Sequence, residues 1–444
     1  MKDIYTEYKE KFLKFVRDNT ADGTFDHEAL YSYGKETFEH GFLDLYGRCM
    51  ELMCEYYLYA GDIEKYLLLY AEFGRVAQEK QGLLLLSCLR LNAYYLANYT
   101  PDLEKATTNL ETALALYREN KIDNPQALYK LNQTMGVVYY IRCENVNAMK
   151  YFYEALQCKL HKATMAQKGT TYVWIGTIEI DRHNYSAALY NFLKAAEIFR
   201  KYNKYHALVS ALVQHACIYM QMKKFKEAHD VLIETLEIAE KHNYEKGRMG
   251  VFHVLGMYHR LTGNYEKSEQ YLLSIIELNK QNTIHQGQVN LELGYLYTET
   301  KEYEKAHTSF LKAAELFAQL KSDRHLTEIY VATARLFLKQ KIYDNVKIYI
   351  DKIEKILSHK NEPHTLKEVY ELYYKYYEGL KKYSKALKYS KLLIEILTNL
   401  YEGRQADGVE QNEIKYHIER SEGSFTTPPT FMGGAGGGLV TCNL

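Results

Sequence analysis

Histidine and carboxylate side chains are the residue types in this sequence that could bind a metal or transfer protons. There are 16 histidines, but no HExxH pair and no cysteine–histidine finger spacing groups them as ligands. His253 and His259 are six residues apart and His215 lies two residues from Cys217, spacings that do not align two side chains on one helix face. Phosphate-loop, dinucleotide and nucleophile-elbow motifs are also missing from the sequence. We therefore expect no catalytic residue, no metal site and no cofactor.

Polar side chains that recur at helical spacing among apolar ones suggest a different chemistry, the binding of a peptide backbone. An extended peptide needs amide, hydroxyl and charged partners on an apolar floor. Residues three and four apart share one helix face, and the candidate set on these faces and at their edges is Lys130, Asn132, Gln133, Tyr140, Thr177, His253, Arg260, Gln288, Asn290, Tyr295 and Arg335. Any helical array carries polar residues on its concave side, so solvated surface is the alternative interpretation of each one.

A repeat positions these residues, and its marker is the residue just after a turn. Nine markers follow one another at intervals of 38 to 42 residues: Ile63, Leu103, Asn145, Tyr185, Phe225, Tyr265, Tyr303, Tyr343 and Tyr383. Small residues recur nine positions before the marker, such as Gly136 and Gly256, and three after it, such as Ala188. They allow two antiparallel helices to approach closely, with the marker aromatic expected as a wedge at the turn. Stacking of such hairpins buries the apolar face that one hairpin leaves open.

Composition favours an all-α protein. Only five prolines occur among 444 residues, and the apolar residues follow a helical period throughout. The 44 tyrosines suit helix–helix seams in which the ring is buried and the hydroxyl reaches a polar partner. The seven cysteines are scattered and predict buried small side chains in a reducing compartment.

The repeat resembles the tetratricopeptide (TPR) motif. The resemblance is carried by Leu255-Gly256, Tyr265 and Ser268 in one unit and by Leu293-Gly294, Tyr303, Ala306, Phe310 and Ala313 in the next. The usual TPR period is about 34 residues. The longer unit here resembles those of the Rap/PlcR/NprR-type peptide receptors of bacteria. The resemblance implies a right-handed TPR superhelix, an α-solenoid, of about nine helical hairpins over residues 46–400, whose first helices line a concave groove.

The two ends of the chain differ from the array. Residues 1–45 predict N-terminal flanking helices over 3–19 and 26–40, with Asp26 as an N-cap. A DNA-reading helix-turn-helix is not evident there, which separates the chain from transcription-factor receptors and leaves the Rap-like ones. Residues 401–444 contain many glycines and predict a flexible tail. Its Gly433-Gly434 pair and Cys442 could mark processing or modification, or the end could occupy the chain's own groove.

Charge and hydropathy limit the partners. Basic and acidic residues balance at 56 each, so nucleic acid is not an expected partner. No apolar run is long enough for a membrane span or a signal core, which predicts a cytoplasmic protein.

The leading functional hypothesis is a non-enzymatic scaffold or regulator that binds a peptide or protein segment in its concave groove. A second protein could contact the N-terminal helices. One alternative is a Rap-like signalling regulator that sequesters or dephosphorylates a partner protein. Another is a precursor whose C-terminal tail is processed or modified into a peptide.

Overall fold

Helices make up every regular element of the part of the chain that the structure describes. This computed structural model describes residues 2–21, 26–100, 102–182, 184–278, 283–320, 322–357 and 363–398. Two flanking helices come first, α1 (Lys2–Ala21) and α2 (His27–Glu39), and the Asp26 side chain accepts a hydrogen bond from the backbone N–H of Ala29 at 2.9 Å. The predicted N-cap and both flanking helices are confirmed within two residues.

Nine hairpins follow α2 in the described residues. Their first helices are α3 (Leu43–Ala60), α5 (Gly82–Tyr99), α7 (Pro125–Ile141), α9 (Gln167–Asp181), α11 (Tyr205–Gln221), α13 (Glu245–Leu261), α15 (Thr283–Glu299), α17 (Asp323–Lys339) and α19 (Pro363–Gly379). Their second helices are α4 (Ile63–Lys80), α6 (Leu103–Glu119), α8 (Asn145–Gln157), α10 (Tyr185–Lys201), α12 (Phe225–Lys241), α14 (Tyr265–Leu278), α16 (Tyr303–Gln319), α18 (Tyr343–Leu357) and a helix over 383–398. A short 3-10 turn, η1 (Lys162–Thr164), precedes α9.

Each predicted marker is the first residue of a second helix. The turn before it ends in a capping residue in several hairpins, and Asp102 is an example, accepting a hydrogen bond from the N–H of Lys105 at 3.1 Å. Two positions before the marker the backbone is left-handed, at Gly263 with φ 80° and at Lys301 with φ 66°. The capping residue and the left-handed residue fix where each second helix begins, which explains the regular spacing of the hairpins.

Close packing inside a hairpin differs from the prediction in one respect. The side chain that fills the space beside the small residue stands seven positions after the marker, not at the marker itself. A methyl carbon added at Gly294 would lie 2.3 Å from a ring carbon of Phe310, and one at Gly176 would lie 2.7 Å from Phe192. Tyr265, by contrast, keeps 38% of its surface exposed, because the first residue of a helix projects from its end. The predicted wedge at the marker is therefore wrong for this residue.

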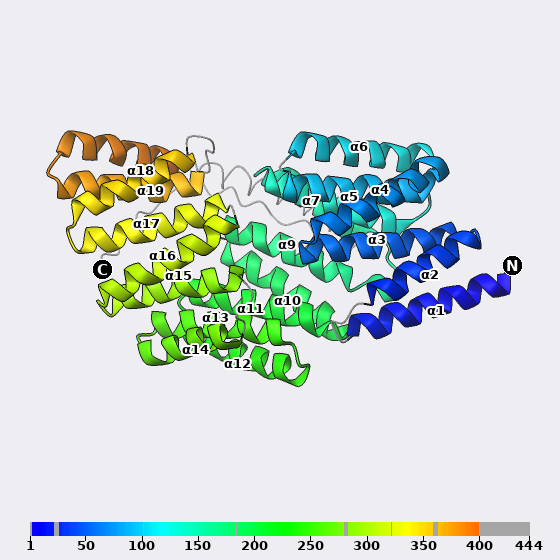
Figure 1. Ribbon diagram of the computed structural model, residues 1–444, viewed down its shortest axis with the longest axis horizontal. Coiled ribbons are helices and arrows are strands. Elements are labelled where there is room, and N and C mark those ends of the chain that lie inside the picture. The colour runs from blue at the N-terminus through cyan, green and yellow to red at the C-terminus, as the bar shows by residue number, and fades with distance from the viewer. Residues whose placement is uncertain are drawn as a thin grey trace, which may run out of the picture.

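The hairpins form two layers. Each first helix packs against the first helices before and after it, whereas the second helices have extensive contacts only with first helices in the described part of the chain. The first helices thus line the inside of the curve as an inner layer and the second helices its outside. Figure 1 shows the array bending from α3 through α12 and back up to α19. The predicted all-α helical-repeat superhelix is confirmed.

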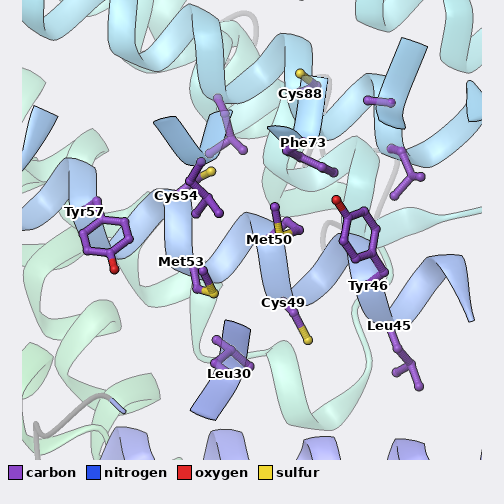
Figure 2. Packing of buried hydrophobic residues seen from close by; sticks show 14 of the residues in the cluster. Leu30, Leu45, Tyr46, Cys49, Met50, Met53, Cys54, Tyr57, Phe73 and Cys88 are labelled. Atoms are coloured by element: carbon purple, nitrogen blue, oxygen red, sulfur yellow. The ribbon is translucent and has the colours of Figure 1, made fainter. Parts of the chain in front are cut away.

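The flanking helices cover the first hairpin. Aromatic contacts join α1 to α2, with the rings of Tyr8 and Tyr33 5.8 Å apart. Figure 2 shows α3 between Leu30 of α2 on one side and Phe73 of α4 and Cys88 of α5 on the other. This first helix is enclosed on several sides, so its charged residues can be deeply buried as well.

Seam tyrosines behave as predicted, since their hydroxyl groups reach polar partners. The Tyr31 hydroxyl donates to Glu72 at 2.7 Å and that of Tyr140 to Asp181 at 2.8 Å. The cysteine prediction holds for Cys49, Cys54, Cys88 and Cys158, which are buried. Cys143 contradicts it: it is exposed because it lies in a turn. Among the described residues, no helix is both long and apolar enough to cross a membrane.

Candidate binding groove

Four charged residues meet on the inner layer of the first three hairpins, Glu51 and Arg90 buried and Glu55 and Lys130 half-buried. Glu51 and Glu55 lie one turn apart on α3, Arg90 on α5 and Lys130 on α7. The Arg90 guanidinium is 2.6 Å from a carboxylate oxygen of each glutamate. The Lys130 ammonium is 2.9 Å from Glu51 and 3.2 Å from Glu55. This inner charge cluster therefore ties three successive first helices together.

Mutual attraction keeps these groups charged although they are buried or half-buried. Burial alone would raise the pKa of Glu51, but the adjacent charges of Lys130 and Arg90 outweigh it and lower that pKa to about 2. Burial opposes the charge of Lys130 as well, and the two carboxylates raise its pKa above the ordinary value. One polar atom of the cluster, Nε of Arg90, is buried without a hydrogen-bond partner among the described residues.

Two cavities adjoin the inner charge cluster. The smaller, about 220 Å³, lies between α3, α5 and α7, with Glu51, Arg90 and Lys130 in its lining. The larger, about 960 Å³, is lined by Glu51 and Lys130 and by residues of α1, α9, α10 and α11. The predicted groove residue Lys130 thus lies between both cavities, on the concave side of the array.

A second set of charges occupies the inner layer of the later hairpins. Arg260 of α13 is 2.6 Å from Glu299 and 3.2 Å from Glu292, both on α15. Its guanidinium also lies over the ring of Tyr295, 5.5 Å from the ring centroid. Arg335 of α17 is 3.3 Å from Glu371 of α19. Three predicted site residues, Arg260, Tyr295 and Arg335, are therefore brought onto one surface.

His253 lies beside this second set. Burial is the main reason that its pKa is lowered, the charge of His285 lowers it further, and Glu292 partly opposes the shift. Its Nε2 atom is buried without a hydrogen-bond partner in the described structure. The imidazole is therefore neutral at pH 7 and offers one donor and one acceptor.

Other predicted residues are satisfied within the array. The Gln133 amide donates to the hydroxyl groups of Tyr129 and Thr171 at 3.1 and 3.2 Å. Thr177 and Asn290 each donate to a backbone carbonyl of their own helix, at 3.0 and 2.8 Å. Gln288 is half-buried on α15 and Tyr140 pairs with Asp181, as described above. Binding by these residues stays a prediction.

Asn132 does not lie where the groove hypothesis puts it. It is only 3% exposed and lines a cavity whose other walls come from α6 and α8, on the outer side of α7. Consecutive residues of a helix are rotated by about 100°, so Asn132 is turned away from the face that carries Gln133. The assignment of Asn132 to the groove is corrected accordingly.

Sequence analysis missed the acidic partners of the groove cations. Glu51 and Glu371 stand three residues before the small-residue position of their hairpins, an inward-facing position in the repeat. The small-residue position itself is occupied by Cys54 in the first hairpin and by Tyr374 in the last. Because neither residue is a glycine or an alanine, the repeat pattern was not extended to these two hairpins. Counting three residues back from Cys54 and Tyr374, as from the glycines of the regular hairpins, identifies both glutamates.

Two expectations concern chemistry outside this groove. Gly433, Gly434 and Cys442 lie outside the described residues, so the tail hypotheses stay predictions. Within the described residues, no group of three or more His, Cys, Asp or Glu side chains could hold a metal ion.

Family models identify the repeat. One tetratricopeptide repeat model matches residues 167–241, and a second matches residues 250–282 and 287–319. No curated protein matches the sequence. Together the models cover α9 to α12 and most of α13 to α16, the regular central hairpins.

Solved structures with a similar fold include a Rap protein, a quorum sensor and a phosphatase. A Rap protein complexed with Competence and Sporulation Factor has a TM-score of 0.56 and 15% identity, covering 80% of this chain and 98% of its own. The apo form of the quorum sensor NprR from B. thuringiensis has a TM-score of 0.52 and 17% identity, covering 79% and 98%. Aspartyl phosphate phosphatase F from Bacillus subtilis has a TM-score of 0.50 and 14% identity, covering 79% and 93%. This chain therefore carries tetratricopeptide repeats and folds as an all-α helical-repeat superhelix, like these Rap- and NprR-type proteins.

Proposed function

We propose that this protein is a non-enzymatic regulator that binds a peptide or protein segment on the concave face of its inner layer. The observation that carries the proposal is the cavity of about 960 Å³, because four first helices and α1 contribute to its walls. Hydrogen-bonding side chains such as Gln126 and Gln167 line it beside apolar ones such as Leu52 and Phe199. A peptide needs both kinds of contact.

The similar folds support this choice of function. The Rap protein named above was solved in a complex with the Competence and Sporulation Factor, and NprR is described as a quorum sensor. In the proposal, ligand binding changes the pitch of the array, since each hairpin is coupled to the next through shared seams. A second protein, contacting α1 and α2, responds to that change.

Binding by the later hairpins is tested with Tyr295→Ala and Arg335→Glu in the full chain. Each change removes a concave side chain, and we expect at least about tenfold weaker recovery of the bound peptide or partner. Recovery is measured by pull-down from the native host with mass spectrometry. Tyr190→Ala and Lys312→Glu change exposed residues of the outer layer and serve as matched controls.

Circular dichroism must show the helical content of all four variants unchanged. If both concave variants recover the same partners as the wild-type chain, the concave face is not the binding surface and the proposal fails.

A signalling regulator that dephosphorylates its partner is the second candidate, because one similar fold belongs to an aspartyl phosphate phosphatase. A dephosphorylating regulator releases phosphate from its partner protein, whereas a regulator that only sequesters the partner does not. Incubating the chain with any phosphorylated partner that it recovers, and measuring phosphate release, separates the two. Binding without release leaves the non-enzymatic regulator.

A further inference from the structure

The cavity of about 960 Å³, hereafter the basic cavity, has an unbalanced charge in a chain whose total charge is zero. Among the residues that the structure describes, three cationic side chains line it, Arg48 of α3, Lys130 of α7 and Lys204 of the turn before α11, against one carboxylate, that of Glu51. Glu51 is already paired with Arg90 and Lys130. The Glu51 carboxylate is thus paired within the inner charge cluster and does not neutralise Arg48 or Lys204.

Arg48 and Lys204 are the cations left over. Both are exposed, and neither forms an ion pair among the described residues. Arg48 also lines the smaller cavity, one turn before Glu51 and Leu52. The two cations line the basic cavity from segments that are far apart in sequence.

Hydrogen-bonding capacity in the same cavity is also unused. The amide oxygen of Gln167 is buried and has no hydrogen-bond partner in the described structure. It is an acceptor, and a peptide N–H is the matching donor. Leu13 of α1 is 47% exposed and lines the cavity with Phe12 and Phe199, so part of its wall is apolar.

The volume limits the ligand to a short segment. Sites for small ligands have volumes of about 300–1,000 Å³, and the basic cavity falls at the upper end of this range. It therefore has room for one end of a peptide or a few of its residues, while the rest of an extended ligand would continue along the inner layer.

We infer that the basic cavity binds a carboxylate-bearing peptide segment, with the carboxylate held by Arg48 and Lys204, a backbone N–H donated to Gln167 and an apolar side chain against Leu13. The inference rests on the proposed function and adds the chemical class of the ligand. The carboxylate comes either from the C-terminus of the peptide or from an Asp or Glu side chain. Salt weakens the binding, since the cations are exposed.

Two pools of random hexapeptides test the inference on the full chain, one with free C-terminal carboxylates and one with C-terminal amides. Peptides retained by the wild-type chain are identified by mass spectrometry. We expect enrichment of the free-acid pool over the amide pool if the terminus is bound, and enrichment of Asp and Glu in both pools if a side chain is bound. Retained peptides with neither feature overturn the inference.

Substitutions at the cations locate the site. Arg48→Ala and Lys204→Ala are each expected to weaken the binding of a selected peptide by about tenfold, as for the loss of a charge-assisted hydrogen bond. Arg48→Lys should recover part of the affinity because it keeps the charge. Arg75→Ala removes an exposed arginine of the outer helix α4 and should leave the affinity unchanged.

The outcomes separate this inference from the proposed function. If peptides are retained and Tyr295→Ala releases them while Arg48→Ala and Lys204→Ala do not, the groove binds peptides but the basic cavity is not the carboxylate site. If no hexapeptide is retained from either pool, the inference is overturned, and the host pull-down alone then decides the proposed function.

Discussion

Charged side chains in the inner layer are held by one another, so each depends on its partners. Arg90 is 7% exposed and forms ion pairs with two carboxylates. The inner charge cluster contains two acids and two bases in all, so its charges balance. Replacing a buried ion pair by apolar groups is often tolerated, but removing one partner leaves an uncompensated charge. The cluster therefore contributes more to which helices meet than to net stability.

Arg90→Leu is expected to lower the free energy of unfolding by about 3–5 kcal/mol at pH 7. Glu51 and Glu55 would then share Lys130 alone. The double variant Glu51→Leu/Arg90→Leu should recover much of that loss, because one acid and one base remain. Urea denaturation followed by far-UV circular dichroism measures both. A double variant no more stable than the single one would contradict the ion-pair account.

The same cluster predicts the direction of a pH effect. The pKa of Glu51 is about 2 in the folded chain, below its ordinary value of 4.5. Its contribution to stability is therefore present above pH 4.5 and is lost as the pH falls toward 2. The stability gap between the wild-type chain and Arg90→Leu should accordingly narrow between pH 5 and pH 3.

Individual site residues were predictable from the sequence where the repeat is regular. Tyr295 directly follows the small residue Gly294 and Arg260 lies one turn after Gly256, and the two side chains do meet in the structure. Glu51 was missed because Cys54 replaces that glycine, and its partner Arg90 lies on another hairpin. Asn132 was assigned to the edge of the groove, but a helix rotates by about 100° per residue, and at its position the side chain meets α6 and α8 instead.

Hairpins were the most predictable elements, since turn, cap and small residues repeat together. All nine markers coincide with the first residue of a second helix. The exact packing partner was not predictable, because the sequence offers an aromatic both at the marker and seven residues later. Only the geometry of two crossing helices decides that Phe310, and not Tyr303, fills the space beside Gly294.

Two glycines of α13 test this packing at the level of one helix. A methyl group at Gly256 would lie 2.8 Å from Leu272, whereas one at Gly250 would have no atom of the described residues within 4 Å. Gly256→Ala should lower the free energy of unfolding by about 1–3 kcal/mol through overpacking. Gly250→Ala should raise it by about 0.5–1 kcal/mol through helix propensity. Equal effects in chemical denaturation would show that the close approach is not needed.

The array is stabilised by contacts between helices that are close together along the chain. Helices in extensive contact are neighbours or next neighbours along the chain, throughout the described residues. Stability is then a sum of hairpin and interface terms, and damage at one end need not reach the other. An array of this kind can unfold in parts.

Leu372→Asp puts a charge into the core between α17 and α19, where Leu372 is 1% exposed. We expect the last hairpins to lose protection in hydrogen exchange, while α3 to α8 keep theirs. Leu387→Asp is the control, because Leu387 is 58% exposed. Loss of protection along the entire array would mean that it unfolds as one cooperative unit.

Stacking without closure also has a mechanical consequence. Because each first helix is tied to the next, partly by ion pairs such as Arg260–Glu299, tension between the two ends of the array is shared among all seams. Small rotations at many seams add up to a large extension before any hairpin opens, as in a coiled spring. A ligand that bridges several first helices would make the array stiffer. Binding on the inner layer would then change the distance between the two ends of the array.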